Sequence, residues 1–118
     1  MRGHGADLLN VTVREVQEDP DTFLRYADQE LLAFVMLFTQ SRTEEGEERM
    51  RRLTEELIEA SLDCGGRYYL PYRLHARDEQ FHRAYPMARE FFAKKRQYDP
   101  DLRFRNSFWE RYAAESGR

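Results

Sequence analysis

The clearest pattern near the start of the chain is an alternation of apolar and polar positions in "LLNVTVREV", residues 8–16. Because successive side chains of a β-strand point to opposite faces, this alternation predicts a strand with one apolar face and one mixed face. The apolar face carries Leu9, Val11 and Val13. The mixed face carries Leu8, Asn10, Thr12 and Arg14. Polar side chains gain nothing from burial in an apolar core, so this polar row favours a sheet whose face covers a ligand.

A second run, "LLAFVMLFTQ" at residues 31–40, is apolar at nearly every position. Such a run is typical of a strand in the middle of a covered sheet, where both faces are buried. The acidic segment between the two runs contains Pro20 and predicts a turn with an irregular connection or a short helix. We therefore expect residues 31–40 to form the centre of the core.

A third pattern, with apolar positions every three or four residues, predicts a long helix over residues 43–63. We expect Thr43 to cap its N-terminus, and the glycines of "CGG" at 64–66 to end it, because glycine readily adopts the left-handed conformation there. The stripe is expected to pack on the sheet, with Cys64 buried as a small hydrophobic side chain. Its members are Met50, Leu53, Leu57, Ala60 and Cys64.

The second half of the chain predicts a short strand followed by helices. Residues 67–72 are typical of a third strand, which ends at Pro71 because proline cannot donate a ladder hydrogen bond. Helical spacing returns in "ARDEQFHRAY" and in "PMAREFFAKKRQY", and the Asp-Pro pair at 99–100 ends the second of these helices. A last helical turn carries Phe108, Trp109 and Tyr112.

These elements predict an α+β fold in which residues 1–118 form a single domain. Its small antiparallel sheet is covered on one side by helices, and an aromatic-rich helical tail forms the C-terminal end. The sheet has few strands for the size of the chain, and its edges are open. A large aromatic tail must also be buried somewhere, so we expect the chain to bind a neighbour.

Charge divides the chain into two halves although the net charge is only −3. Residues 1–64 contain 7 basic and 15 acidic side chains, whereas residues 65–118 contain 12 basic and 7 acidic ones and 12 of the 16 aromatic residues. Arginine interleaved with aromatic residues suits stacking on a base or a flavin and pairing with a phosphate or carboxylate. The same composition also suits an aromatic core with arginines on its outside, and both interpretations stay open at this point.

Several functional classes have no support in the sequence. No apolar run reaches the roughly 20 residues of a membrane span, and the start has no secretory signal, so we expect a cytoplasmic protein. Serine-hydrolase, phosphate-loop, dinucleotide-binding and HExxH zinc motifs are not present, and no nucleic-acid-binding signature is found. A strand end separates His75 from the helix that carries His82, so we expect no metal site.

The strongest candidate for a site is "GGRYYLPYRLH", residues 65–75. It brings tyrosine hydroxyls, a guanidinium and an imidazole close together in sequence, and such a set recognises an oxygen-rich ligand or stabilises an anion. The polar row with Thr12 and Arg14 on the first strand offers a second set. An ordinary core strand that is rich in tyrosine remains the alternative interpretation.

The second half resembles a known family. "GGRYYLPYRLHARDEQFHRAYPMAREFFAKKRQYDPDLRFRNSFWERY" looks like the C-terminal cap, or substrate, domain of FAD-linked oxidases of the vanillyl-alcohol oxidase superfamily, with aldonolactone and alditol oxidases as similar members. The shared features are Gly-Gly before a Tyr-rich strand, a basic residue followed closely by His, "AYP", "FF" with "KR", and "YDPDLRFRN". With the upstream strands and helix, the likeness spans about residues 7–113.

The resemblance implies roles for seven residues. In that family the cap sheet lies over the flavin ring and the substrate lies between them, so four residues are expected to face the substrate and three to be catalytic or to face the flavin. The substrate-facing residues would be Thr12, Arg14, Tyr69 and Tyr72. The catalytic or flavin-facing residues would be Arg73, His75 and Asn106. The implied reaction is hydride transfer from an alcohol carbon to FAD, with Arg73 or Arg14 stabilising an oxygen or the reduced flavin.

The resemblance also implies a missing half. Family members carry an N-terminal FAD-binding domain with a Gly-rich pyrophosphate loop, and this sequence contains neither. We therefore expect the chain alone to bind FAD poorly and to have no turnover, with an FAD-binding domain or subunit as its partner and a small alcohol as substrate. The alternative is a non-catalytic interaction module, derived from the same domain, that forms a homodimer.

Overall fold

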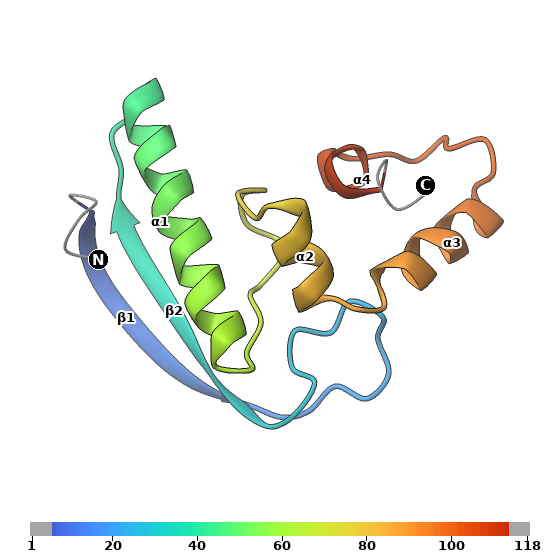
Figure 1. Cartoon of the computed structure of the whole chain (residues 1–118), viewed down its shortest axis with the longest axis horizontal. Coiled ribbons are helices and arrows are strands. Elements are labelled where there is room, and N and C mark those ends of the chain that lie inside the picture. Colours follow the sequence, from blue (N-terminus) through green and yellow to red (C-terminus); the bar gives the residue numbers. More distant parts are fainter. Residues whose placement is uncertain (1–5, 114–118) are drawn as a thin grey trace.

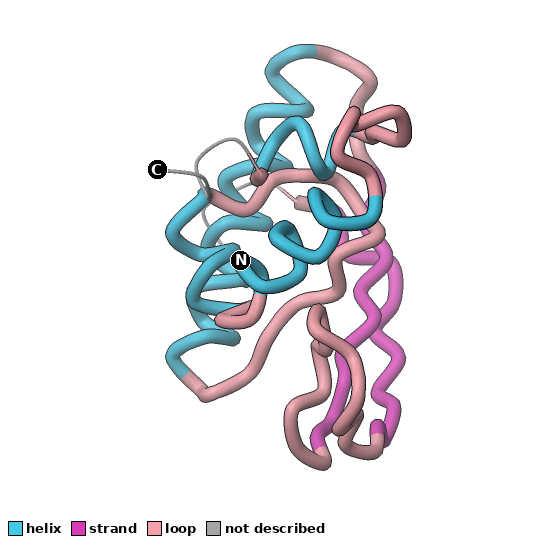
Figure 2. Tube along the Cα trace, turned by 90° about the vertical axis from the view of Figure 1, so that its right-hand side faces the viewer, coloured by secondary structure: helices cyan, strands magenta, loops and turns pink. Residues whose placement is uncertain are grey.

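The computed structural model describes residues 6–113, which form an antiparallel two-stranded sheet and four helices (Figure 1). All four helices lie on the same side of this sheet, which we call the β ribbon (Figure 2). The α+β fold predicted from the sequence is therefore confirmed. In chain order the elements are β1 (Asp7–Val16), β2 (Leu31–Thr39), α1 (Glu44–Asp63), α2 (Asp78–Ala84), α3 (Ala88–Tyr98) and α4 (Ser107–Tyr112).

The register of the β ribbon determines which side chains share a face. Val11 lies opposite Met36 and Val13 opposite Phe34, and the ladder shifts by one residue between Leu8 and Asn10. Directly opposed residues of an antiparallel pair project to the same side, so one face carries an apolar set from both strands. That set is Val11, Val13, Leu32, Phe34 and Met36.

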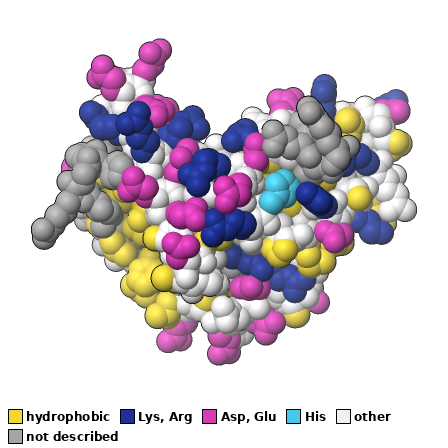
Figure 3. All heavy atoms as spheres, in the orientation of Figure 1, with side chains coloured by type: hydrophobic (Ala, Val, Ile, Leu, Met, Phe, Trp, Pro, Cys, Tyr) yellow, Lys and Arg dark blue, Asp and Glu magenta, His cyan; other side chains and the backbone are white. Residues whose placement is uncertain are grey.

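The prediction that residues 31–40 form the centre of the core is wrong. Phe34 on one face and Leu37 on the other are each 59% exposed. Hydrophobic side chains gather on the surface over the ribbon (Figure 3). An apolar strand is buried on both faces only where other layers supply cover, and within residues 6–113 the sheet has two strands with helices on one side. The apolar pattern therefore marks a surface that this part of the chain leaves open.

The predicted third strand at residues 67–72 is not formed either. The segment is irregular, and side chains hold its carbonyls in place of a strand ladder: Ser61 Oγ donates to the Arg67 carbonyl at 2.8 Å, and the Tyr85 hydroxyl donates to the Tyr68 carbonyl. Arg67 in turn donates to the Arg25 carbonyl and to the Asp28 carboxylate. The segment is thus fixed to α1, to α2 and to the irregular connection between the strands.

α1 begins and ends where the sequence predicts. Thr43 Oγ1 accepts a hydrogen bond from the Gly46 N–H at 3.0 Å, and Gly65 has φ +75°. The N–H groups of Gly65 and Gly66 donate to the carbonyls of Leu62 and Ser61, which is the Schellman pattern of a helix C-terminus. The two glycines therefore satisfy carbonyls at the end of the helix with their own N–H groups, as expected.

The buried face of α1 differs from the predicted stripe. Leu53 and Ile58 are buried, whereas Ala60 and Cys64 are exposed. Ile58 belongs to the same cluster as the aromatic residues of the C-terminal helices. α1 therefore turns toward α2 as well as toward the β ribbon, and its apolar face is rotated away from Cys64.

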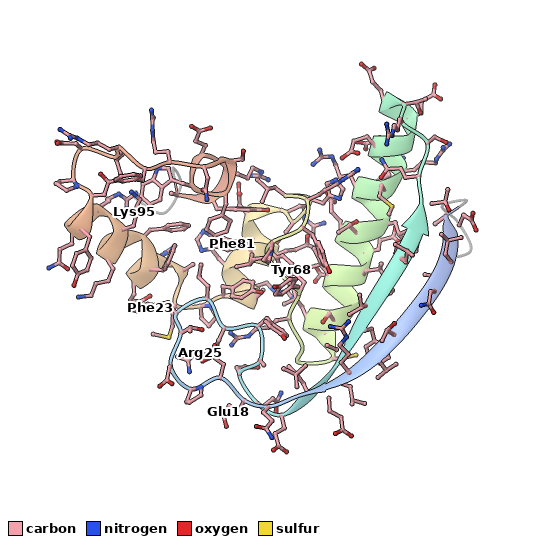
Figure 4. All side chains as sticks on the ribbon, turned by 180° about the vertical axis from the view of Figure 1, so that it is seen from behind. Glu18, Phe23, Arg25, Tyr68, Phe81 and Lys95 are labelled. Atoms are coloured by element: carbon pink, nitrogen blue, oxygen red, sulfur yellow. The ribbon has the colours of Figure 1, made fainter. Side chains whose placement is uncertain are left out.

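The core lies in the C-terminal half of the chain. Phe81 of α2 is fully buried, its ring stacks on Tyr112 of α4 at 4.4 Å between centroids, and it also contacts Phe92 of α3. Figure 4 shows Phe81 directed to the other C-terminal helices and Tyr68 between α2 and α1. The predicted aromatic-rich helical tail is confirmed. No helix in the described part of the chain is long and apolar enough to cross a membrane.

Candidate functional site

The fold brings Arg73 and His75 together on the carboxylate of Glu47, in the first turn of α1. His75 Nε2 lies 2.7 Å from Glu47 Oε1, and Arg73 pairs with Glu47 Oε2. Gln40, which follows β2, donates to Glu47 Oε2 at 2.9 Å and accepts from Arg73 at 2.7 Å. The residue that follows β2, the first turn of α1 and the irregular 67–77 segment thus meet at one point, which we call the Glu47 cluster (Gln40, Glu47, Arg73 and His75).

His75 is held at both ring nitrogens. Its side chain is only 5% exposed, with Nε2 against Glu47 and Nδ1 at 3.3 Å from Thr54 Oγ1. The Thr54 hydroxyl itself donates to the Met50 carbonyl at 2.7 Å, one turn earlier in α1. His75 therefore fixes the 67–77 segment against α1, and its ring is turned into the protein and away from solvent.

Glu47 is a member of the cluster that the sequence did not reveal. Hydrogen bonds from His75 and Gln40, with the positive charge of Arg73, hold the pKa of its carboxyl below the usual value of 4.5. In the sequence Glu47 is one of several acidic residues that suit the positive end of a helix dipole. Only the tertiary fold, which lays residues 73–75 across this turn, distinguishes it from its neighbours.

An open pocket of about 520 Å³ lies beside the cluster. The Arg73 side chain, 57% exposed, reaches its edge and is the member of the cluster best placed to contact a ligand. Both charge signs are present, so the pocket suits a polar ligand with hydroxyl groups or a small anion. Its lining consists of Gln40, Arg42, Thr43, Glu44, Glu47 and Arg73.

A glycine makes the close approach at this end of α1 possible. A Cβ on Gly46 would lie 2.3 Å from the Ser41 carbonyl oxygen, a distance that no side chain tolerates. The Cα of Gly46 lets the 40–43 turn fold down on the first turn of the helix, and Gln40 thereby reaches Glu47. The missing side chain at Gly46 thus allows the contact between Gln40 and Glu47.

The predicted substrate-facing residues form two further groups. Tyr69 and Tyr72 are exposed and, with Tyr26, form a row of edge-to-face rings with centroids 5.3 and 5.4 Å apart. Thr12 and Arg14 lie on one face of β1, both exposed, and within residues 6–113 their side chains make no hydrogen bond or ion pair. No bond among the described residues joins either group to the Glu47 cluster.

Asn106 has a clear local task. It is the N-cap of α4, and its Oδ1 accepts from the Trp109 N–H at 2.9 Å. This bond satisfies one of the free N–H groups at the start of the helix. The side chain is exposed and is committed to the backbone of its own helix.

The residues expected at a flavin are mostly engaged within the protein. His75 is buried and bonded at both nitrogens, and Asn106 caps a helix, so two of the three residues expected at a flavin point into their own structure. Arg73 alone presents a free edge, and the described residues thus do not form a cradle for FAD. No group of three or more His, Cys, Asp or Glu side chains within residues 6–113 is arranged to hold a metal ion.

The Glu47 cluster can bind a polar molecule from one side, through Arg73. Thr12 and Arg14 lie farther along the ribbon, opposite Val35 and Ala33, and form a separate polar set. Among residues 6–113, the hydrogen bonds show no nucleophile paired with a base at the pocket. Comparison of the chain with protein-family models, with curated proteins and with solved structures finds no match.

Proposed function

We propose that the chain is the substrate-side domain of an FAD-dependent oxidoreductase that acts on an alcohol or a sugar-derived substrate. The observation that carries the proposal is the placement of Arg73, whose guanidinium is held by Glu47 and Gln40 and half exposed at an open pocket. The second support is the resemblance of residues 65–112 to oxidase cap domains, which is also the reason for expecting Arg73 near the flavin. The chain alone is expected to be inactive.

The residues would divide the work as follows. Arg73 would pair with a substrate oxygen or with a developing negative charge, because a guanidinium offers several donors in a fixed plane. Thr12 and Arg14 would bind hydroxyl groups from the β ribbon. Glu47 and His75 would hold the segment that carries Arg73, since both are engaged inside the protein.

The kind of partner is inferred from the cofactor site that the described residues do not form. They offer no cradle for FAD, so an FAD-binding domain from another chain or segment would bring the hydride acceptor and cover the ribbon and the Arg73 pocket. The open apolar faces of the ribbon support this arrangement, because they are suited to contact with another domain.

Reconstitution tests this proposal. An aldonolactone or alditol oxidase, stripped of its own C-terminal cap and loaded with FAD, would be mixed with the chain under anaerobic conditions and given a panel of alditols. The chain is expected to restore alcohol-dependent bleaching of the flavin, and Arg73→Ala to lower the rate by about tenfold or more. Arg52→Ala, on the exposed face of α1, is the matched control and should leave the rate unchanged.

Two results would overturn the proposal. One is a purified chain that is yellow and oxidises an alcohol without a second protein. The other is a flavin domain whose bleaching rate is the same with and without the chain across the whole panel.

A second candidate function is a non-catalytic interaction module, which the exposed apolar side chains of the ribbon favour. The mass of the chain in solution, measured at several concentrations of the flavin domain, distinguishes the two functions. A chain that binds the flavin domain supports the oxidase proposal, and a self-associated chain indifferent to it supports the module.

A further inference from the structure

Besides the row with Tyr69 and Tyr72, the described residues expose two apolar sets, one on β1 and β2 and one at the end of α3. Figure 1 shows these elements on opposite sides of the molecule. The first is the β ribbon. The second, which we call the tail edge, consists of Tyr98 and Phe104, which are 82% and 81% exposed. Asp99 holds them near each other, because its carboxylate accepts from the N–H groups of Arg103 and Phe104 directly after α3 ends. Aromatic side chains so far exposed are uncommon on a surface that makes no contacts.

The two sets lie in regions of opposite charge. Residues 7–39, which contain the ribbon and its connection, have 7 acidic and 2 basic side chains, and residues 88–105, which contain the tail edge, have 3 acidic and 6 basic ones. Lys94, Arg103 and Arg105, all exposed, surround Tyr98 and Phe104 in the sequence. The ribbon thus suits an apolar partner with a basic rim, and the tail edge suits an apolar partner with an acidic rim.

We propose that two copies of the chain pair antiparallel about a two-fold axis, with the tail edge of each copy on the β ribbon of the other. A second copy carries both required surfaces, so one symmetry operation covers both apolar sets and closes the assembly at two subunits. This pairing goes beyond the proposed function and does not depend on it, because it concerns the chain without a flavin domain.

The exposed apolar surface is large enough for such a pair. On the ribbon face that carries Phe34, four apolar side chains are each more than a third exposed, as are the two of the tail edge: Val11, Val13, Leu32, Phe34, Tyr98 and Phe104. Together they amount to on the order of 700 Å² per copy, close to the about 800 Å² per partner of a standard interface. A pair that covers most of this surface would be stable at micromolar concentration.

Ribbon-to-ribbon pairing explains the same surfaces less well. It would bring two acidic halves together, at an electrostatic cost, and would leave both tail edges exposed. The register shift at Leu9 and the charges of Arg14 and Glu15 also interrupt the outer edge of β1, and such features oppose edge-to-edge pairing.

Sedimentation equilibrium of the full chain over roughly 1–100 μM, with added NaCl up to about 0.5 M, tests the pairing. We expect a dimer at low salt whose dissociation constant rises with salt. Phe104→Ser and Phe34→Ser are each expected to raise that constant about tenfold or more. Both side chains are mainly exposed, and circular dichroism verifies that the variants fold. Ala60→Ser, on the exposed side of α1, is the control and should not change the constant.

Mixing the two variants gives the sharpest result. In a mixed dimer one contact is wild type and the other carries both substitutions. Because Phe104 and Phe34 are proposed to meet in the same contact, losing both there costs little more than losing one, so the mixture is expected to associate more tightly than either variant alone. The proposal is overturned by a chain that stays monomeric at every concentration, by a Phe104→Ser variant that dimerises like the wild type, or by a mixture that shows no gain. A failure of flavin reconstitution leaves these outcomes unaffected, so the two proposals are tested separately.

Discussion

A single carboxylate, that of Glu47, determines where the segment with Arg73 and His75 lies. It bonds three side chains from two other parts of the chain, and one of them, His75, is almost fully buried. A buried polar group that loses its partner costs more than the bond itself is worth, because it stays without water. We therefore expect the position of Arg73 to depend on the ionised form of Glu47.

This dependence predicts a pH effect. The pKa of Glu47 is lowered in the folded state relative to its ordinary value of 4.5, so its stabilising contribution is complete above that value. It is then lost as the pH falls through the lower, folded-state pKa. Glu47→Gln should therefore have a lower urea midpoint than the wild type at pH 7, and the gap should narrow below about pH 4. Urea unfolding at several pH values measures it.

Glu48→Gln is the matched control for this measurement. Glu48 lies in the same turn of α1, and among the described residues its partners are the exposed side chains of Arg51 and Arg52. Its substitution should change the midpoint little at any pH, because exposed ion pairs contribute little. A Glu47→Gln gap of the same size at pH 7 and pH 3 would contradict the role given to the Glu47 carboxylate.

At the scale of elements, the helices are held by local signals and by aromatic contacts. α4 has only six residues, and its start depends on the Asn106 cap, while its buried side rests on Phe81 and Phe92 through Tyr112 and Trp109. A short helix has too little hydrogen bonding of its own to be stable in water. The cap and the aromatic packing therefore have to act together.

The cap can be tested directly. Asn106→Ala is expected to lower the free energy of unfolding by about 1 kcal/mol, because the Trp109 N–H loses its acceptor. Asn106→Asp keeps an oxygen at the same position and should remain close to the wild type. Chemical unfolding measures both. If the alanine variant is as stable as the wild type, the cap is not the task of this side chain, and a role at a flavin becomes the better interpretation.

The sequence predicts elements well where the signal is local. Thr43 before an acidic turn, the glycines at 65–66, and the Asp-Pro pair at 99–100 each define a helix boundary, and α1 and α3 begin or end there. These signals depend on backbone conformation and nearest neighbours. They therefore define the helix ends regardless of how the rest of the chain packs.

Sequence patterns predict burial and strand pairing poorly where these depend on residues far away in the chain. The run at 31–40 has the pattern of a buried strand, but nothing in that pattern says whether covering layers exist within residues 6–113. Residues 67–72 have strand composition, yet Ser61 and Tyr85 bind their carbonyls before any ladder forms. The bond between Glu47 and His75 spans 28 positions and has no motif, so the candidate site was found only in part.

At the scale of the whole molecule, the chain consists of a self-sufficient aromatic core and an open β ribbon. The fully buried side chains lie mainly in the C-terminal half, and the large exposed apolar ones lie mainly on the ribbon. Helices lie on one side of the ribbon, so its other side is open to contact with another surface. The residues proposed to bind substrate divide between the ribbon and the Arg73 segment.

Hydrogen exchange of the chain, measured alone at a concentration where it is monomeric and again with an FAD-loaded oxidase domain, tests the central claim most directly. That claim is that the ribbon and the Arg73 segment together form a surface that another domain covers. We predict that amides of residues 7–16 and 67–77 gain protection when the flavin domain is added, while those of α2 and α3 stay unchanged. Exchange in both segments that is the same with and without the flavin domain would contradict it.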